Sequence, residues 1–159
     1  MFQLIPAPLH RVVLRLAHAV RRRWWRIAQV RLRGCRIFAF DAAGQVLLIR
    51  HSYGSGNWML PGGGLGRGED PLAAALRELR EETGLGLTMP RQFAAVEEPL
   101  YGTINAVHLI AGEAEGELRI DGREVIEARY FSANALPPEL SPMLAARFAD
   151  WLVAAQQQD

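Results

Sequence analysis

The chain has 159 residues, the length of one ordinary domain. Its residues are 50% hydrophobic and 22% charged, and this near-average composition excludes a disordered, collagen-like or coiled-coil chain. Its formal net charge is +1. The chain has one cysteine, and a single cysteine excludes an intrachain disulfide framework and a cysteine-rich zinc site. A single cysteine also fits a reducing compartment, so we expect a cytoplasmic protein.

The basic residues are unevenly distributed along the chain. Half of the 18 basic residues lie within the first 36 positions, which hold no acidic residue, whereas all 17 acidic residues follow. Apolar residues between Leu9 and Ile27 recur at helical spacing, and no apolar run is long enough to span a membrane. We therefore predict a basic amphipathic N-terminal helix over 1–32 and a globular domain over 33–159.

Several interpretations of the basic helix are open. Its apolar stripe could pack on the domain or on a second copy of the chain in a homodimer, and this packing is the interpretation that we favour. Its basic face, with Trp24 and Trp25, could instead lie on an anionic membrane surface or bind nucleic acid. An arginine-rich segment without acidic residues also resembles a mitochondrial transit peptide, although this one lacks serine.

The globular part is predicted to mix strands and helices. A helix is predicted from about Asp70 to Thr83, because Pro71 stands at its start and Gly84 at its end. Strands and helices do not alternate regularly, which predicts an α/β protein of the α+β kind, with a sheet flanked by helices. The predicted strands are 36–40, 45–50, 57–60, 92–96, 104–111 and 125–131, and a last helix is predicted over 142–155.

Three glutamates of the first predicted helix carry the clearest chemical signal. Glu78, Glu81 and Glu82 lie within an arc of about 100° on the helical wheel. Like charges at this spacing destabilise a bare helix by a few tenths of a kcal/mol per pair. A hard divalent cation offsets this repulsion, because Mg²⁺ and Mn²⁺ bind carboxylate oxygens and keep waters and substrate phosphates as their other ligands.

A glycine-rich turn precedes this helix. Without side chains, its residues let the backbone approach a ligand closely and leave carbonyl or amide groups free to point at it. A metal held by carboxylates beside such a loop suits a phosphate substrate, which the metal would bridge, polarise and supply with a water nucleophile. The glycines are Gly62, Gly63 and Gly64.

The spacing in residues 63–85 is that of a known motif. The segment fits G-x5-E-x7-R-E-U-x-E-E-x-G-U, with U aliphatic, at every specified position, and the fixed positions match by chance roughly once in 10⁸ registers. In this the chain resembles the Nudix hydrolases. The likeness extends to 44–50, 58–63 and 124–131, where Tyr130 replaces the usual Trp of E-x-x-E-x-x-W-F, and it covers about 35–137.

The resemblance implies a fold, an activity and a set of site residues. It implies an α/β/α sandwich with a mixed sheet, to which the basic N-terminal helix would be extra. It implies hydrolysis of a nucleoside diphosphate linked to another group, with Mg²⁺ as cofactor and Mn²⁺ as a substitute. Carried over by motif position, the metal ligands would be Glu78, Glu81, Glu82 and the carbonyl of Gly63, with Glu69 and Arg77 orienting the glutamates.

The general base is left open by the motif. Glu78 is one candidate, and a carboxylate outside the motif is the other. Glu124 and Glu127 are the best placed in the late strand, and Glu97 and Glu98 come after them. Each of these four also has the ordinary interpretation of a solvated surface glutamate.

Substrate selection is expected outside the motif. Arg50 could hold a phosphate or be an exposed strand-end charge. Four aromatic residues could stack on a base or pack in the core, and Tyr101 lies sixteen residues beyond Leu85, a placement that resembles dinucleoside polyphosphate hydrolases. For His51 we expect a structural role. The aromatic candidates are Tyr53, Trp58, Phe93 and Tyr101.

One alternative function belongs to a different class. A Nudix fold can serve as a catalytically silent module that binds a nucleotide or RNA. Such modules typically lose glutamates of the motif, and all of them are present here. We therefore expect an enzyme.

Overall fold

The computed structural model describes residues 13, 17, 32–100, 103–120 and 122–157. The predicted basic helix over 1–32 falls almost wholly outside these residues, and Tyr101 lies outside them as well. The proposed packing of that helix and the proposed stacking by Tyr101 therefore stay predictions.

The five strands form one mixed sheet in the order β3-β4-β1-β2-β5. Strand β1 runs parallel to β4, and the other neighbouring strands are antiparallel. The predicted mixed sheet is therefore confirmed. The strands are β1 (Leu32–Phe40), β2 (Val46–His51), β3 (Gly86–Leu100), β4 (Thr103–Glu115) and β5 (Val125–Phe131), and the helices are α2 (Pro71–Thr83) and α3 (Pro142–Gln156).

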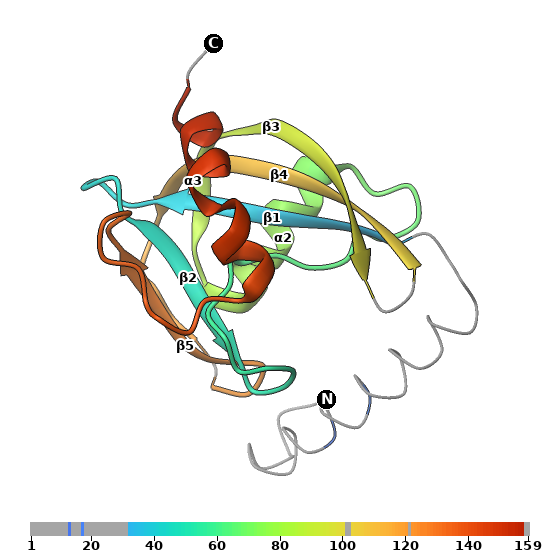
Figure 1. Ribbon diagram of the computed structural model, residues 1–159, viewed down its shortest axis with the longest axis horizontal. Helices are drawn as coiled ribbons and strands as arrows, with labels where there is room; N and C mark the ends of the chain where they lie inside the picture. Colours follow the sequence, from blue (N-terminus) through green and yellow to red (C-terminus); the bar gives the residue numbers. More distant parts are fainter. Residues whose placement is uncertain (1–12, 14–16, 18–31, 101–102, 121, 158–159) are drawn as a thin grey trace.

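The two helices cover opposite faces of the sheet, as Figure 1 shows. Successive side chains of a strand point to opposite faces, so β1 contributes to both cores. Cys35 and Ile37 pack with Leu79 of α2, whereas Phe38 packs against Phe148 of α3, with ring centroids 5.8 Å apart. The arrangement is the α/β/α sandwich that the resemblance implied.

Local sequence accounts for both ends of α2. The side chain of Asp70 caps the helix by accepting a hydrogen bond of 3.0 Å from the Ala73 amide, and Pro71 occupies the first turn. Gly84 ends the helix in the left-handed conformation, with φ 75°, and its amide donates to the Arg80 carbonyl. These caps fix where the glutamates of α2 stand relative to the sheet.

The strand predicted over 92–96 is part of a longer strand that begins immediately after α2. The pairing of β3 with β4 shifts register between Thr88 and Arg91, where Met89 has a positive φ of 48°. This irregularity and the adjacent Pro90 interrupt the apolar–polar alternation by which a strand is recognised. The prediction was therefore right in kind and too short.

The short strand predicted over 57–60 is wrong. Residues there form only isolated bridges, one between Met59 and Ile49 and one between Trp58 and Leu140. The segment lies at the end of β2, and Pro61 and the glycines that follow it turn the chain away before a ladder can extend.

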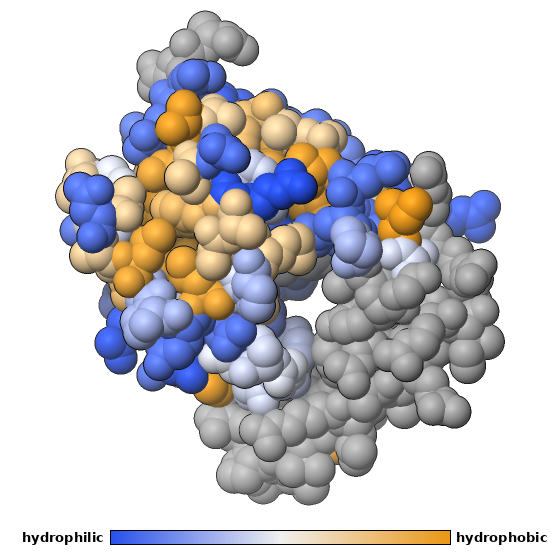
Figure 2. All heavy atoms as spheres, viewed as in Figure 1, coloured by the Kyte–Doolittle hydropathy of each residue, from blue (hydrophilic) through white to orange (hydrophobic). Residues whose placement is uncertain are grey.

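The surface over α3 is mixed in character. Hydrophobic and hydrophilic side chains are interspersed on the face seen in Figure 2, which is the face that α3 covers in Figure 1. No helix among the described residues is both long enough and apolar enough to cross a membrane.

Candidate active site

The three glutamates of the motif differ in exposure. Glu82 is buried, with 8% of its surface exposed, and the side chain of Glu78 is 16% exposed. The side chain of Glu81 is 61% exposed. Two of the carboxylates are therefore largely enclosed by the protein, while the third lies mostly in solvent.

Both carboxylate oxygens of Glu82 are held by the protein. Oε1 lies 2.9 Å from Nε2 of His51, and Oε2 accepts a 2.9 Å hydrogen bond from the Gly62 amide. Burial raises the pKa of Glu82, and the hydrogen bonds from His51 and Gly62 act in the opposite direction. The carboxylate is thus oriented by one contact from β2 and one from the glycine turn.

The glycine turn lies between β1 and the glutamates. The Gly63 carbonyl accepts a 2.9 Å hydrogen bond from the Cys35 amide, and Gly64 bridges to Gly34. A Cβ atom at Gly63 would lie 2.5 Å from the carboxyl carbon of Glu78. Only glycine therefore lets this backbone approach the Glu78 carboxylate so closely.

Arg77 links most of the acidic groups around the turn. Its guanidinium pairs bidentately with Glu69, at 2.9 and 3.1 Å, and donates to Glu78 at 2.7 Å and to Glu81 at 3.3 Å. It also donates to the Gly64 carbonyl at 3.3 Å. The carboxylates of Glu69 and Glu78 raise the pKa of Arg77, and Arg77 lowers the pKa of Glu69. A planar, five-donor guanidinium is the side chain that can make all these contacts at once.

The electrostatics around Glu78 identify its neighbours. Burial is the main reason why the pKa of Glu78 is raised, and Arg77 acts against it. The negative charges of Glu81 and Glu124 raise that pKa further. Of the two glutamates predicted in the late strand, Glu124 is the one whose charge acts on Glu78.

Contacts at the end of β2 hold Glu124 in this position. The Tyr53 hydroxyl donates to Oε1 of Glu124 at 2.7 Å, and the Ser52 amide donates to the Glu124 carbonyl at 2.8 Å. The Tyr53 ring stacks on His51, with centroids 4.9 Å apart. Since His51 contacts Glu82, the run 51–53 at the end of β2 contacts both Glu82 and Glu124.

Glu127 is engaged in different contacts. Its Oε2 pairs with Nη1 of Arg50 at 3.1 Å, and its Oε1 lies 3.8 Å from Arg129. Arg50 also donates to the Gly56 carbonyl at 2.8 Å. The structure therefore separates the two late-strand candidates, with Glu124 near the glutamates of α2 and Glu127 paired with arginines.

Two of the aromatic candidates lie in the core. Trp58 is 4% exposed and packs edge-on against Phe131, with centroids 5.0 Å apart. Phe93 packs against Phe38 at 5.7 Å. Trp58 is therefore a core residue, and Phe93 is partly buried against the same core, so stacking of a substrate base on either ring stays a prediction.

His51, for which we expected a structural role, lies in the site and contacts Glu82. It lies on β2 two positions after the buried Ile49, so a regular strand directs both side chains to the same face. The signal in the sequence was a polar residue at a strand position that is expected to be buried and to face the helix. Its contact with Glu82 could not be foreseen without the pairing of the elements.

The donor set fits a hard divalent cation in kind. Every candidate ligand atom is an oxygen, and each oxygen of Glu82 accepts only one hydrogen bond, although an ionised carboxylate offers about four acceptor positions. Among the described residues, no three His, Cys, Asp or Glu side chains are already grouped to hold a metal ion. Glu81, whose side chain is the most exposed of the three glutamates, has the most room to turn toward a cation.

Comparisons with known proteins identify the family. A family model described as the NUDIX domain matches residues 30–152. The chain is 42% identical over 101 residues to an RNA pyrophosphohydrolase of Rhodospirillum rubrum, which covers 64% of this chain and 49% of that relative. It is 30% identical over 105 residues to the NAD-capped RNA hydrolase NudC of Vibrio vulnificus, which covers 65% of this chain and 40% of that relative. The chain thus matches half or less of the length of these two relatives.

A solved structure supports the same assignment. The MutT NUDIX hydrolase from Burkholderia pseudomallei superposes with a TM-score of 0.68 at 25% identity, and the match covers 80% of this chain and 99% of that chain. The two curated relatives are both named as hydrolases, which agrees with the expected enzyme. The chain belongs to the Nudix hydrolases.

Proposed function

We propose that this Nudix hydrolase works with Mg²⁺, for which Mn²⁺ can substitute, held by Glu78, Glu81, Glu82 and the Gly63 carbonyl. The observation that carries the proposal is the close approach of the glycine turn to Glu78, described above. When bound, a divalent cation supplies positive charge for the phosphate oxygens and lowers the pKa of a bound water. The remaining work falls to the protein's own groups.

The glycine turn and Arg77 have separate tasks in this proposal. Residues 62–64 lack side chains, so a pyrophosphate can lie against their backbone. Arg77 ties Glu69, Glu78 and Glu81 to the Gly64 carbonyl and so keeps the carboxylates in register with the turn. The guanidinium acts through the glutamates and does not touch the substrate.

Metal dependence is the direct test of this function. Treatment with EDTA is expected to abolish hydrolysis of nucleoside diphosphate derivatives, and added Mg²⁺ is expected to restore it, because the cation joins the carboxylates to the phosphates. Release of nucleotide and phosphate products is measured across ADP-ribose, NADH, dinucleoside polyphosphates, nucleotide sugars and oxidised dNTPs. Hydrolysis that survives complete chelation contradicts the proposal.

Glu124 is the general base that we infer for the water nucleophile. Its charge raises the pKa of Glu78, and Tyr53 orients its carboxylate, whereas Glu127 forms an ion pair with Arg50. The Glu124→Gln enzyme is expected to lose about 10²- to 10⁴-fold in kcat, the usual contribution of a general base. Glu127→Gln is the matched control, and its kcat is expected to change by less than about 10-fold. Equal losses in the two variants reject the assignment.

Other features of the protein stay predictions. Action in the cytoplasm is supported by the nucleotide-type substrate and by the single, unpaired Cys35. The homodimer, and contact of the basic segment with a membrane surface or nucleic acid, depend on residues 1–32, which lie mostly outside the described part of the chain. The names of the two curated relatives make RNA 5′ ends a further substrate to include in the panel.

A further inference from the structure

Residues 51–53 at the end of β2 contact two carboxylates that have different tasks in the proposed function. Nε2 of His51 lies 2.9 Å from Oε1 of Glu82, which is a metal ligand in that proposal. The Tyr53 hydroxyl donates at 2.7 Å to Oε1 of Glu124, which is its general base. His51 and Tyr53 both lie outside the Nudix motif, so the structure joins the motif to the late strand through a segment that the motif does not include.

The contact between His51 and Glu82 is enclosed by the protein. His51 is 9% exposed and Glu82 is 8% exposed, so water has little access to either partner. An ionised carboxylate only accepts hydrogen bonds, and Nε2 of His51 is therefore the donor. Hydrogen bonds to a charged acceptor are shorter and stronger than neutral ones. His51 therefore fixes the direction of Oε1 and leaves further acceptor positions of the carboxylate for a cation.

The contact between Tyr53 and Glu124 lies nearer the surface. Glu124 is exposed, and an exposed glutamate has several rotamers open to it. The Tyr53 hydroxyl selects among these rotamers by donating to Oε1, and the Ser52 amide holds the backbone of Glu124 by donating to its carbonyl at 2.8 Å. The Glu124 carboxylate is therefore held in one orientation relative to residues 51–53.

The two rings are stacked, so the two contacts are coupled. The centroids of the His51 and Tyr53 rings lie 4.9 Å apart, and the ring planes are inclined by 26°. Residues two apart in an extended segment point to the same side, which brings the rings together. Arg50 closes the loop that follows by donating to the Gly56 carbonyl at 2.8 Å. One packed unit therefore sets where the two glutamates stand relative to each other.

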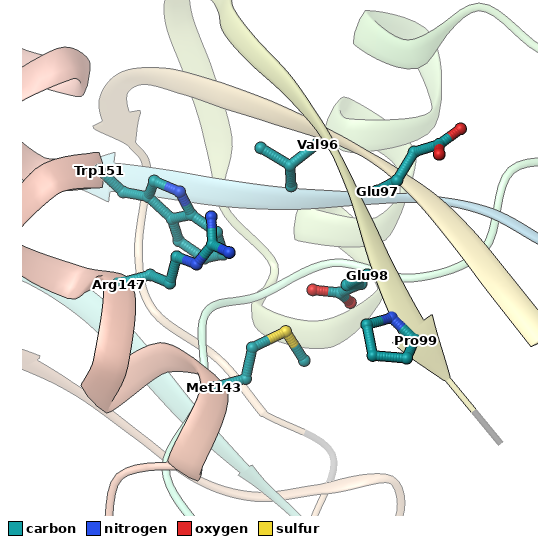
Figure 3. Close-up of a pocket in the computed structure, with 7 residues that line it drawn as sticks. All are labelled: Val96, Glu97, Glu98, Pro99, Met143, Arg147 and Trp151. Carbon is teal, nitrogen blue, oxygen red and sulfur yellow. The ribbon is translucent and has the colours of Figure 1, made fainter. Parts of the chain in front are cut away.

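This unit lies on the side of the sheet that faces α2, because His51 contacts Glu82 of α2. A cavity of about 220 Å³, drawn in Figure 3, lies on the other side, and the residues that line it come from β3 and α3. The effects of substitutions at His51 and Tyr53 are therefore expected at the carboxylates, with the lining residues of the cavity unchanged.

We propose that His51 and Tyr53 are positioning residues with separate tasks in one unit. His51 sets the direction of Glu82 for the cation, and Tyr53 sets the direction of Glu124 for removal of a proton from the water nucleophile. The inference rests on the proposed function, because it takes Glu82 to be a metal ligand and Glu124 to be the base. A role in packing alone would cost stability and would not divide metal affinity and kcat between the two residues.

Binding of Mn²⁺ to the full-length protein without substrate tests the task of His51. His51→Phe keeps a ring for Tyr53 to stack on and removes the donor, and we expect its dissociation constant for Mn²⁺ to rise about 10- to 100-fold, the usual effect of losing such a partner of a metal ligand. His51→Gln is the matched rescue, because its amide can donate in place of Nε2, and its dissociation constant is expected to stay within about 3-fold of that of the unaltered protein. Free Mn²⁺ is measured by electron paramagnetic resonance, and the unfolding temperature shows whether each variant is folded.

Two results overturn the task of His51. An unchanged Mn²⁺ affinity in His51→Phe means that the donor does not orient Glu82. Equal losses of affinity in folded His51→Phe and His51→Gln mean that the imidazole ring matters for its packing and not for its hydrogen bond.

Steady-state kinetics at saturating Mn²⁺ test the task of Tyr53. Tyr53→Phe removes a single oxygen atom from a half-buried side chain. Its kcat is expected to fall at least about 10-fold, while KM and the dissociation constant for Mn²⁺ stay within about 3-fold. Tyr130→Phe is the matched control, because Tyr130 pairs with Leu47, toward the other end of β2 from His51, and its kcat should not change. An unchanged kcat in Tyr53→Phe, or a loss of Mn²⁺ affinity as large as that of His51→Phe, overturns the division of tasks.

The metal measurement also separates this inference from the proposed function. Unchanged affinities and kinetics in the variants of a metal-dependent enzyme overturn the inference and leave the proposed function intact. If the unaltered protein binds Mn²⁺ but hydrolyses no substrate of the panel, the proposed function fails, and the affinities of His51→Phe and His51→Gln still decide the task of His51.

Discussion

Replacement of Glu82 by glutamine is expected to reduce kcat by about 100-fold or more. Residues that only orient a metal ligand typically cost 10- to 100-fold when they are mutated, and a side chain that itself binds the cation should cost at least as much. Glutamine keeps the shape of the side chain and can still accept from the Gly62 amide. What the variant removes is the negative charge, so the loss should appear in kcat rather than in folding.

The stability of the Glu82→Gln protein gives this prediction a second readout. Burial raises the pKa of Glu82, which means that the folded protein holds the proton of this carboxyl more tightly than the unfolded chain does. Above that pKa the ionised carboxylate is therefore unfavourable to folding, and a neutral amide removes this cost. The unfolding temperature is expected to stay the same or to rise. Glu117, an exposed glutamate that pairs with Arg119, supplies the control. The Glu117→Gln variant should change neither kcat nor stability. Near-normal turnover of Glu82→Gln shows that Glu82 is not a ligand.

Local signals in the sequence were enough to place the glutamates of α2. The ends of that helix depend on Asp70, Pro71 and Gly84, which act on the backbone beside them. The motif carries the positions of the glutamates because 3.6 residues per turn fix which of them share a face. These features could be predicted because each depends on neighbours within one or two turns.

The partners of those glutamates could not be predicted in the same way. The pairing of β2 with β5 sets Arg50 opposite Glu127, and an irregularity follows between Arg50 and His51. This register pairs Glu127 with Arg50 and leaves Glu124 to interact with Glu78 of α2. The ion pair of Arg36 with Glu98 likewise joins residues 62 positions apart. Such contacts depend on strand order and on one-residue shifts, which the local pattern does not record.

The sequence also did not show which aromatic residues would be buried in the core. A tryptophan just before a glycine turn is equally suited to stack on a base and to anchor the turn, and Trp58 anchors it by packing against Phe131. The sequence contains Trp151 at a helical core position, and only the structure shows that it lines a cavity as well as the core. The sequence therefore predicted Trp151 only as part of the apolar face of the last helix.

Replacement of Gly62 by alanine is expected to lower the free energy of unfolding by about 2–6 kcal/mol. Gly62 has a φ of 138°, a conformation that residues with a Cβ rarely adopt, and such strain costs about 1–3 kcal/mol. The added Cβ would also overlap the carbonyl oxygen of Cys35 and lie 2.9 Å from its carbonyl carbon, and overpacking adds about 1–3 kcal/mol. The clash cannot be relieved by a rotamer change, because the atoms that it meets are backbone atoms of β1, an inner strand of the sheet.

Gly44→Ala separates strain from overlap as the control. Gly44 also has a positive φ, of 73°, but a Cβ there would meet nothing within 4 Å, so only the conformational cost of about 1–2 kcal/mol should be seen. Urea unfolding measures both variants, and a domain of this size should lose about 2–4 °C in unfolding temperature per kcal/mol.

The Gly62 amide orients Glu82, so Gly62→Ala should lose activity as well as stability, whereas Gly44→Ala should stay active. Equal stability losses in the two variants would mean that β1 can move away from the turn, and the backbone beside Glu78 would then be less fixed than the contacts of Gly62 and Gly63 imply.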